Sequence, residues 1–356
     1  MSPVSSPNEI LQLSSKDIER LDEHQLPKLL RYLLAAEANN ARKKGEDASY
    51  YVPEQINVAD GGSDGNWTGP VIPGFVPRNE ALFQCKAHTG TLTDAIFKNE
   101  LAPKTPRKEE YIIKPKIKTI FEQKGAYILL WGHHTINWSP REIREKAEER
   151  LKKAGFDLST EAEILILDSN KIAEWANRHL AAVRYVISAT IGSNPYLLKT
   201  CDEWERQNAF SKAYYDNDYL KKLSTSIIGE LNKPNACIRI TGSSGVGKTR
   251  FIFETIRGDQ KTAYTAVFLD CHDRYSRDIF DLVNYLESTE MSTILIIDNC
   301  PTEMHKSLER RTTNSGLCLI TISHEIEQFG APTMPINLDS DKMRDVVVNM
   351  LSEAPY

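Results

Sequence analysis

The chain has 356 residues, 40% of them hydrophobic, which is enough for two or three domains that each bury a core. Its 44 Lys and Arg against 49 Asp and Glu give a net charge of −5, which excludes a protein that coats nucleic acid by overall charge. The polar start carries no signal-peptide pattern and no apolar run could span a membrane, so we expect a cytoplasmic protein with no membrane partner. Six scattered cysteines without a C-x-x-C pair predict reduced thiols.

The chain begins with a polar stretch and then takes up a helical pattern. Residues 1–13 are expected to form a flexible tail, and the helical pattern starts at Ser14. Apolar residues recur at helical spacing between Leu29 and Leu34, so one face of this helix packs inward. Glu37 lies at the margin of that face. It is either a surface carboxylate, the commoner case, or a placed functional acid.

An acidic turn and a mixed strand follow this helix. The turn Asp60-Gly-Gly-Ser-Asp64-Gly carries two acids after a short apolar segment. A strand is predicted over 81–87, where Gln84 and Lys86 point to one face because strand side chains alternate. Phosphodiester hydrolysis needs a metal-binding acid, further oxygen ligands and a cation, and this pattern supplies all three. The alternative is a hairpin whose Gln and Lys face solvent.

This D-G-G-x-D turn followed by Q-x-K resembles the Mrr-like branch of the PD-(D/E)xK nucleases. The resemblance implies that Asp64 binds the metal, that Gln84 stands at the second acidic position and that Lys86 is the catalytic lysine. It further implies that the Cys85 carbonyl is a metal ligand. By the same resemblance, Glu37 matches the acid that this family often places on the preceding helix. The implied activity is Mg²⁺-dependent cleavage of double-stranded DNA.

Two features of this nuclease-like pattern stay open. Asp60 could hold the metal in place of Asp64, although Asp60 is better placed to cap the turn. Gln84 is a neutral ligand where relatives carry an acid, and a neutral ligand neutralises no metal charge.

A basic strip lies further along the same region. Its six cationic residues are Lys104, Arg107, Lys108, Lys114, Lys116 and Lys118. If the nuclease resemblance holds, this strip could approach a DNA backbone. A solvated loop with ordinary surface lysines is an equally good reading.

The rest of the first domain reads as an α/β unit. Buried strands are predicted at 125–131 and 163–167, with a helix between them that Ser139 caps. We therefore expect a restriction-endonuclease-like α/β domain over 14–190. The polar and aromatic stretch 191–232, with weak helical signals, is expected to be a helical linker.

The next segment has the pattern of a phosphate-binding loop. An apolar strand over 237–241 runs directly into G-x-x-x-x-G-K-T, and a helix follows, which is the context that separates a nucleotide site from a structural loop. The glycines let successive N–H groups converge on an anion, Lys248 faces the β- and γ-phosphates, and the Thr249 hydroxyl can hold Mg²⁺. The residues expected to bind ATP here are Gly242, Ser243, Ser244, Gly245, Val246, Gly247, Lys248, Thr249 and Arg250, together with Asp298, Asn299 and Thr321 from later segments.

Later strands complete this nucleotide site. The continuous apolar run 293–298 ends in Asp298 and is predicted to be a Walker B strand, with Asp298 holding Mg²⁺ through water beside Thr249. A further strand puts Thr321 or Ser323 where either could sense the γ-phosphate. Strands that alternate with helices and carry ligands at their carboxyl ends predict a doubly wound α/β fold.

This half of the chain resembles the STAND class of signalling NTPases. The matching segments are S-G-V-G-K-T-R, the I-I-D-N strand end and I-N-L-D-S-D-K-M-R-D over 336–345. Two departures imply slow turnover and a switch that works by binding ATP. Asn299 follows Asp298 where many relatives carry a second acid, and Glu303 is a weak substitute base. Ser323 stands where many relatives have a sensor arginine.

An Mrr-like nuclease ahead of a STAND NTPase resembles the antiviral STAND proteins of prokaryotes, the Avs family. We expect the NTPase core over 233–332, and a last strand with the start of a lid helix over 333–356, where the chain looks truncated. The resemblance implies that an absent C-terminal sensor recognises a phage protein, that ATP drives assembly into a homo-oligomer, a tetramer, and that this assembly activates the nuclease. Two alternatives are a non-catalytic DNA-binding or oligomerising first domain and a modification-dependent restriction nuclease.

Overall fold

The computed structural model describes all of the chain except residues 1–10, 55–62, 88–89, 106–109, 134–135, 193–196, 209–213, 215–216, 274–275, 313–315, 325–333 and 339–356. It divides into two compact units. We call Leu13–Asn177 with Tyr185–Gly192 the first unit, and Met1–Gln12, Arg178–Arg184 and Ser193–Tyr356 the second unit. Helix α8 (Leu180–Thr190) is divided between them, with Arg178–Arg184 in the second unit and Tyr185–Gly192 in the first.

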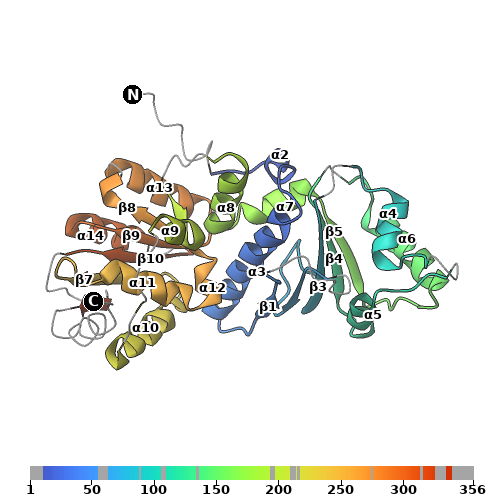
Figure 1. Cartoon of the computed structure of the whole chain (residues 1–356), viewed down its shortest axis with the longest axis horizontal. Coiled ribbons are helices and arrows are strands. Elements are labelled where there is room, and N and C mark those ends of the chain that lie inside the picture. The colour runs from blue at the N-terminus through green and yellow to red at the C-terminus, as the bar shows by residue number, and fades with distance from the viewer. Residues whose placement is uncertain are drawn as a thin grey trace, which may run out of the picture. The chain divides into compact units, whose positions relative to one another are not determined.

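The first unit is built on a five-stranded sheet whose order follows the chain, β1-β2-β3-β4-β5 (Figure 1). The strands are β1 (Ser49–Tyr51), β2 (Gly65–Thr68), β3 (Glu80–Lys86), β4 (Ala126–Trp131) and β5 (Glu163–Leu167). The first three strands pair antiparallel, and β3, β4 and β5 pair parallel. The acidic turn therefore leads straight into a paired strand, β2. Asp60 lies outside the described residues.

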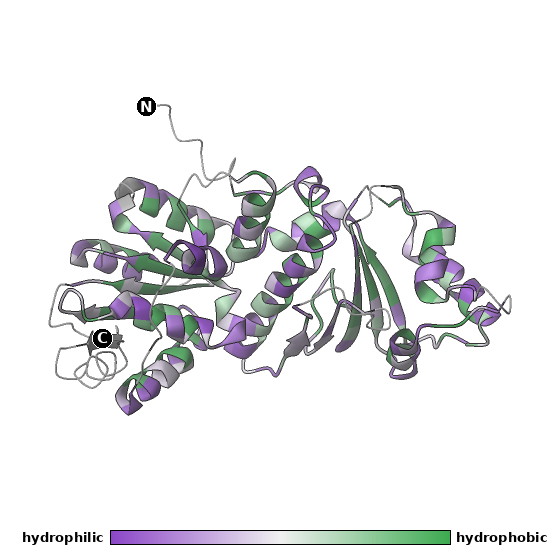
Figure 2. Cartoon of the chain, in the orientation of Figure 1, coloured by the Kyte–Doolittle hydropathy of each residue, from purple (hydrophilic) through white to green (hydrophobic). Residues whose placement is uncertain are grey.

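Helices supply the apolar cover of this sheet. They are α2 (Ser15–Ile18), α3 (Gln25–Lys43), α4 (Asp94–Leu101), α5 (Pro115–Glu122), α6 (Pro140–Lys153) and α7 (Ser169–Ala176). The predicted cap of α6 is confirmed, because Ser139 and Glu142 form a reciprocal capping box. Every residue of β4 is buried, since helices lie on both of its faces. Figure 2 shows the resulting pattern of apolar strands with polar outer helix surfaces.

The second unit holds a six-stranded sheet with the order β11-β7-β10-β9-β8-β6. Its strands are β6 (Lys199–Thr200), β7 (Cys237–Gly242), β8 (Ala266–Asp270), β9 (Thr293–Asp298), β10 (Leu317–Ile322) and β11 (Met334–Leu338). Neighbouring strands are parallel except β6, which pairs antiparallel with β8 at the edge. This order places β7, which carries the phosphate loop, between β10 and β11.

Helices cover both faces of this second sheet, as the doubly wound prediction requires. They are α9 (Cys201–Gln207), α10 (Asp218–Leu231), α11 (Lys248–Arg257), α12 (Gln260–Ala263), α13 (Ser276–Ser288) and α14 (Thr302–Arg311). In Figure 1, α10 and α11 lie on one side of the strands, and α13 and α14 lie on the other. The second unit is thus a mixed α/β fold with a mainly parallel sheet.

The segment expected to be a linker, 191–232, differs from that expectation. It contributes β6, α9 and α10 to the second unit. Leu220, Ile227 and Leu231 of α10 are fully or almost fully buried in the same core as Phe251 of α11. Because these apolar side chains need cover, α10 packs on the sheet instead of bridging two domains.

Candidate functional site

The phosphate loop connects β7 to α11 with the backbone geometry that its glycines permit. Gly245 and Gly247 have φ angles of 80° and 88°, in the left-handed region that disfavours other residues. Gly247 is the N-cap of α11, so Lys248 is the first residue of the helix. The free N–H groups and the positive dipole end of α11 therefore face the loop, as anion binding requires.

Lys248 is held inside this loop by the loop itself. Its Nζ donates to the carbonyl oxygens of Gly242 at 2.9 Å and Ser243 at 2.8 Å. Burial lowers the pKa of the Lys248 ammonium, and the nearby Asp298 carboxylate opposes that shift. The contacts fix a positive charge where a phosphate group would enter the loop.

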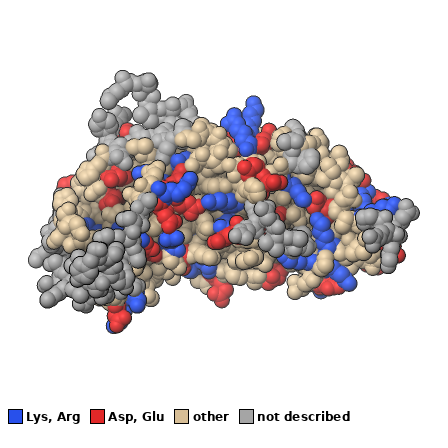
Figure 3. Space-filling model, viewed as in Figure 1, with Lys and Arg blue, Asp and Glu red and all other residues tan. Residues whose placement is uncertain are grey.

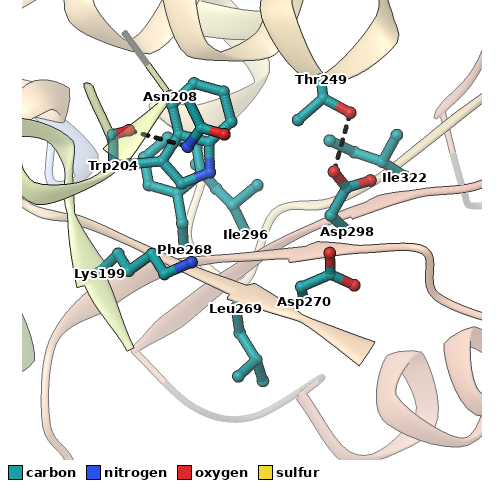
Figure 4. Close-up of a pocket in the computed structure, with 10 residues that line it drawn as sticks. All are labelled: Lys199, Trp204, Asn208, Thr249, Phe268, Leu269, Asp270, Ile296, Asp298 and Ile322. Carbon is teal, nitrogen blue, oxygen red and sulfur yellow. Dashed lines mark hydrogen bonds between the residues drawn. The ribbon is translucent and has the colours of Figure 1, made fainter. Parts of the chain in front are cut away.

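Thr249 and Asp298 meet beside the loop. The Thr249 Oγ1 donates to Asp298 Oδ2 at 2.8 Å (Figure 4). Burial raises the pKa of Asp298, while the hydrogen bond from Thr249 opposes the shift. A hydroxyl and a carboxylate are the oxygen ligands, direct or through water, that Mg²⁺ prefers. These two side chains therefore fit a magnesium site, and they would hold the ion.

Two adjoining hollows lie around this pair. The larger, of about 400 Å³, is lined by Trp204, Asn208, Ser244, Gly245, Gly247, Lys248, Thr249, Arg250, Asp298, Asn299, Ile322, Ser323 and His324. The smaller, of about 140 Å³, is lined by Lys199, Trp204, Asn208, Thr249, Phe268, Leu269, Asp270, Ile296, Asp298 and Ile322 (Figure 4). Eight of the residues predicted to bind nucleotide thus line one cavity, whose volume is ordinary for a small-molecule site.

Thr321 lies elsewhere than the sequence predicts. It is fully buried, its Oγ1 accepts from Arg239 Nη1 at 3.3 Å, and it lies 2.8 Å from His305 Nδ1. Because His305 belongs to α14, this contact places the Thr321 side chain against that helix. Among the described residues, Ser323 lines the cavity and Thr321 does not. The geometry favours Ser323, the other residue considered for this role.

The polar and aromatic cavity residues missed by sequence reasoning include Lys199, Trp204, Asn208 and Asp270. The first three belong to the stretch expected to be a linker. Trp204 stacks on Phe253 at 4.7 Å and on Phe268 at 5.4 Å between ring centroids, which fixes α9 beside the cavity. A signal for α9 exists, because Thr200 and Glu203 form a capping box.

In the first unit, the acidic turn and β3 come together. Asp64 Oδ2 accepts hydrogen bonds from Gln84 Nε2 at 2.7 Å and from the Cys85 backbone N–H at 2.6 Å. Gln84 is 7% exposed, so this side chain lies inside the fold and not on a solvent-facing hairpin. Asp64, Gln84 and Cys85 therefore form one contiguous cluster.

Lys86 is held by an acid that the sequence reasoning missed. Its Nζ lies 3.1 Å from Glu100 Oε1, and Glu100 Oε2 lies 2.9 Å from Lys114 Nζ. The pKa of the nearby Tyr127 hydroxyl is raised by burial and then by the charges of Glu100 and Asp64. The sequence separation of Glu100 and Lys86 could not predict this ion pair, because α4 and β3 come together only in the folded unit.

Glu37 occupies a different environment. Its Oε1 accepts a hydrogen bond from Trp175 Nε1 at 2.8 Å. The Trp175 ring lies 6.4 Å from the Phe83 ring, and Phe83 alternates with Gln84 and Lys86 along β3. The Trp175 contact of Glu37 is thus on the Phe83 face of the sheet, opposite the face that carries Gln84 and Lys86.

The basic strip is partly neutralised. Lys114 pairs with Glu100, and Lys118 lies 3.8 Å from Glu122. Arg107 and Lys108 lie outside the described residues. On the face drawn in Figure 3, acidic and basic side chains are interspersed.

Comparison with known proteins adds little. No protein-family model matches the chain, and no curated protein matches it. PCH-2 of C. elegans is 12% identical, with 44% of this chain and 54% of that chain covered and a TM-score of 0.30. NtrX from Brucella abortus in complex with ATP is also 12% identical, with 77% and 62% covered and a TM-score of 0.30. NtrX in complex with ADP is 12% identical, with 74% and 57% covered and a TM-score of 0.25.

The chain therefore spans 54 to 62% of the length of these solved chains. Likenesses this weak decide nothing about function. Within the part of the chain that the structure describes, no helix is both long and apolar enough to cross a membrane.

Proposed function

We propose that the second unit binds ATP together with Mg²⁺ and acts as a nucleotide-dependent switch. The observation that carries this proposal is the hydrogen bond between Thr249 and Asp298 beside the glycine loop, at 2.8 Å. It joins the two side chains that a phosphate-loop site needs for the metal, from separate elements, α11 and β9. A structural loop would have no need of this pairing.

Each residue has a distinct task in the proposed site. Lys248 supplies a cation to the phosphates, the amides of the loop and of α11 donate hydrogen bonds to them, and Thr249 and Asp298 hold the metal. When bound, Mg²⁺ neutralises charge on the phosphate oxygens. Trp204 and Asn208 stand at the rim of the same cavity, where nucleotide binding could be sensed by α9.

Binding of a fluorescent ATP analogue, with Mg²⁺, tests this site. We expect Lys248→Ala to weaken binding by more than about tenfold, because a buried charge-assisted contact is lost. Lys233→Ala is a matched control, since Lys233 is exposed and pairs with Glu230. Equal affinity of the wild type and Lys248→Ala would exclude the site.

We propose further that the first unit is a Mg²⁺-dependent endonuclease acting on double-stranded DNA. The contacts of Asp64 with Gln84 and Cys85 support it, since they bring a carboxylate beside the proposed oxygen ligands. Lys86, held by Glu100, would supply the cation, and the Asp64 carboxylate, the Gln84 side chain and the Cys85 carbonyl would hold the metal. Glu37, fixed by Trp175, has the least support from its contacts.

Plasmid cleavage with Mg²⁺ tests the nuclease proposal. We expect Lys86→Ala and Asp64→Asn to lower the cleavage rate by at least about a hundredfold, as loss of a catalytic group does. Lys124→Ala is the matched control, because Lys124 is exposed and pairs with Glu161. Cleavage that survives Lys86→Ala would favour a non-catalytic DNA-binding or oligomerising first unit.

The widest form of the proposal is antiphage defence in the manner of the Avs proteins. A phage protein would trigger ATP-dependent assembly into a homo-oligomer, such as a tetramer, and assembly would activate the nuclease. Cleavage that needs ATP, phage lysate and Lys248 together would support this form. Dependence on DNA methylation, with none on lysate, would favour a modification-dependent restriction nuclease.

A further inference from the structure

Two carboxylates lie at the carboxyl ends of neighbouring parallel strands in the second unit. Asp270 ends β8, Asp298 ends β9, and the two residues are paired in register. Both line the smaller hollow together with Thr249, and Figure 4 shows them on the same side of the sheet. The sequence predicts a role for Asp298 alone.

The two carboxylates differ in how their oxygens are used. Asp298 Oδ2 accepts from Thr249, and its Oδ1 accepts from the Asn299 backbone N–H at 2.8 Å. Asp270 Oδ1 accepts from Asn299 Nδ2 at 3.0 Å and from the His272 N–H at 2.9 Å. The contacts of Asp270 with described residues thus all fall on Oδ1, so Oδ2 remains available to the hollow.

Asn299 links the pair. It adopts a left-handed backbone with φ of 53°, a conformation that asparagine tolerates better than most residues. Its backbone N–H binds Asp298 while its side chain binds Asp270. An acid at position 299 would place a third carboxylate against Asp270. The side-chain amide of Asn299 instead donates a hydrogen bond to Asp270 Oδ1 and so orients this carboxylate.

We propose that Asp270 is the catalytic base of ATP hydrolysis in this unit, an inference that rests on the proposed ATP site. A water oxygen forms a bond to the γ-phosphorus, and the bond from that phosphorus to the β,γ-bridging oxygen breaks. The water proton passes to Asp270 and then to solvent, leaving ADP and inorganic phosphate. Asp270 thus does the work that relatives give to an acid after the Walker B aspartate.

The other acid considered for this role is placed poorly. Glu303 belongs to the first turn of α14, its side chain is 86% exposed, and it lies 3.3 Å from Lys306 Nζ. Among the described residues, the only carboxylates that line either hollow are Asp270 and Asp298. Since Asp298 is engaged by Thr249, Asp270 is the acid left to act on water.

Two measurements on the full chain test the assignment. We expect Asp270→Asn to lower the rate of ATP hydrolysis by about 10² to 10⁴-fold, the usual worth of a general base. Its affinity for a non-hydrolysable ATP analogue with Mg²⁺ should stay within about threefold of the wild type, because the amide keeps the size of the carboxylate. Glu303→Gln should hydrolyse ATP at the wild-type rate.

Each outcome separates the two proposals. Absence of analogue binding in the wild type would overturn the ATP site and, with it, the base. Normal binding with hydrolysis unchanged in Asp270→Asn would overturn the base while the ATP site stands, and loss of hydrolysis in Glu303→Gln alone would give the role to Glu303. Equal melting temperatures of the variants and wild type exclude misfolding as the cause.

Discussion

At the scale of single residues, the chemistry of the proposed nucleotide site is largely local in the chain. Lys248 and Thr249 could be predicted because a loop of eight residues carries its own backbone geometry and its own cation. Asp298 could be predicted because it ends a continuous apolar run that follows a phosphate-loop motif in the chain. Asp270 ends a strand in the same way, but its pairing with Asp298 depends on β8 and β9 being neighbours, which no local pattern shows.

The nuclease-like cluster shows the same limit. The resemblance to the Mrr-like nucleases predicts that Asp64 shares a site with Gln84 and leaves Asp60 as an alternative. Glu100 comes from α4 and meets Lys86 only through tertiary packing.

The expectation for Thr321 differs from the structure, in which Thr321 contacts His305 and does not line the cavity. Strand alternation does not separate Thr321 from Ser323, because they are two positions apart. The structure separates them because β10 ends at Ile322 and Ser323 follows that end, beside the cavity.

A buried histidine gives a residue-scale prediction about pH. Burial lowers the pKa of His305 to about 4, and the positive charges of Arg239 and Lys306 add to this. An unfolded histidine titrates near 6.5, so between these values the unfolded state binds more protons. The stabilising effect of neutral His305 is therefore complete above about pH 6.5 and is lost as the pH falls toward 4.

We expect this loss to lower the free energy of unfolding by roughly 1 to 3 kcal/mol between pH 7 and pH 4.5. Chemical denaturation at several pH values measures it. His305→Asn should give a shallower pH dependence, since Asn keeps a polar atom for Thr321 but does not titrate. His272→Asn, at an exposed histidine, should keep the wild-type slope. An identical slope in His305→Asn would contradict the assignment.

At the scale of elements, sequence periodicity predicts where the strands begin and end better than it predicts their order in the sheet. Long apolar runs such as β5 and β9 begin and end within a residue of their predicted bounds. Short elements such as β1, β2 and β6 were missed, because two to four residues carry too little alternation to be read. Their identity comes from pairing partners, which lie far away in sequence.

The α9–α10 stretch shows how composition can mislead at this scale. Polar and aromatic residues suggested a linker. In the structure, the Trp204 ring stacks on the Phe253 and Phe268 rings, and α10 buries one narrow apolar face. An amphipathic helix is half polar by necessity, so composition cannot separate it from a linker. The same stretch also supplies part of the rim of the nucleotide cavity.

At the scale of the whole molecule, each unit has a sheet and a core of its own. The core clusters of the two sheets share no residue. The residues proposed to bind ATP all belong to the second unit. A ligand that binds only the native form stabilises it by RT ln(1 + [L]/Kd), which is about 2.7 kcal/mol at a ligand concentration of 100 Kd.

We therefore expect two unfolding transitions in calorimetry. Mg²⁺ with a non-hydrolysable ATP analogue should raise the midpoint temperature of only one of them. The unit that shifts is identified by Ile227→Ala, which removes a fully buried side chain of α10 and should lower that same transition. Ser226→Ala, at an exposed neighbour, is its control. A single transition that the ligand shifts as a whole would mean that the units unfold as one cooperative body. In that case nucleotide binding would already be coupled thermodynamically to the nuclease-like unit, without assembly of several chains.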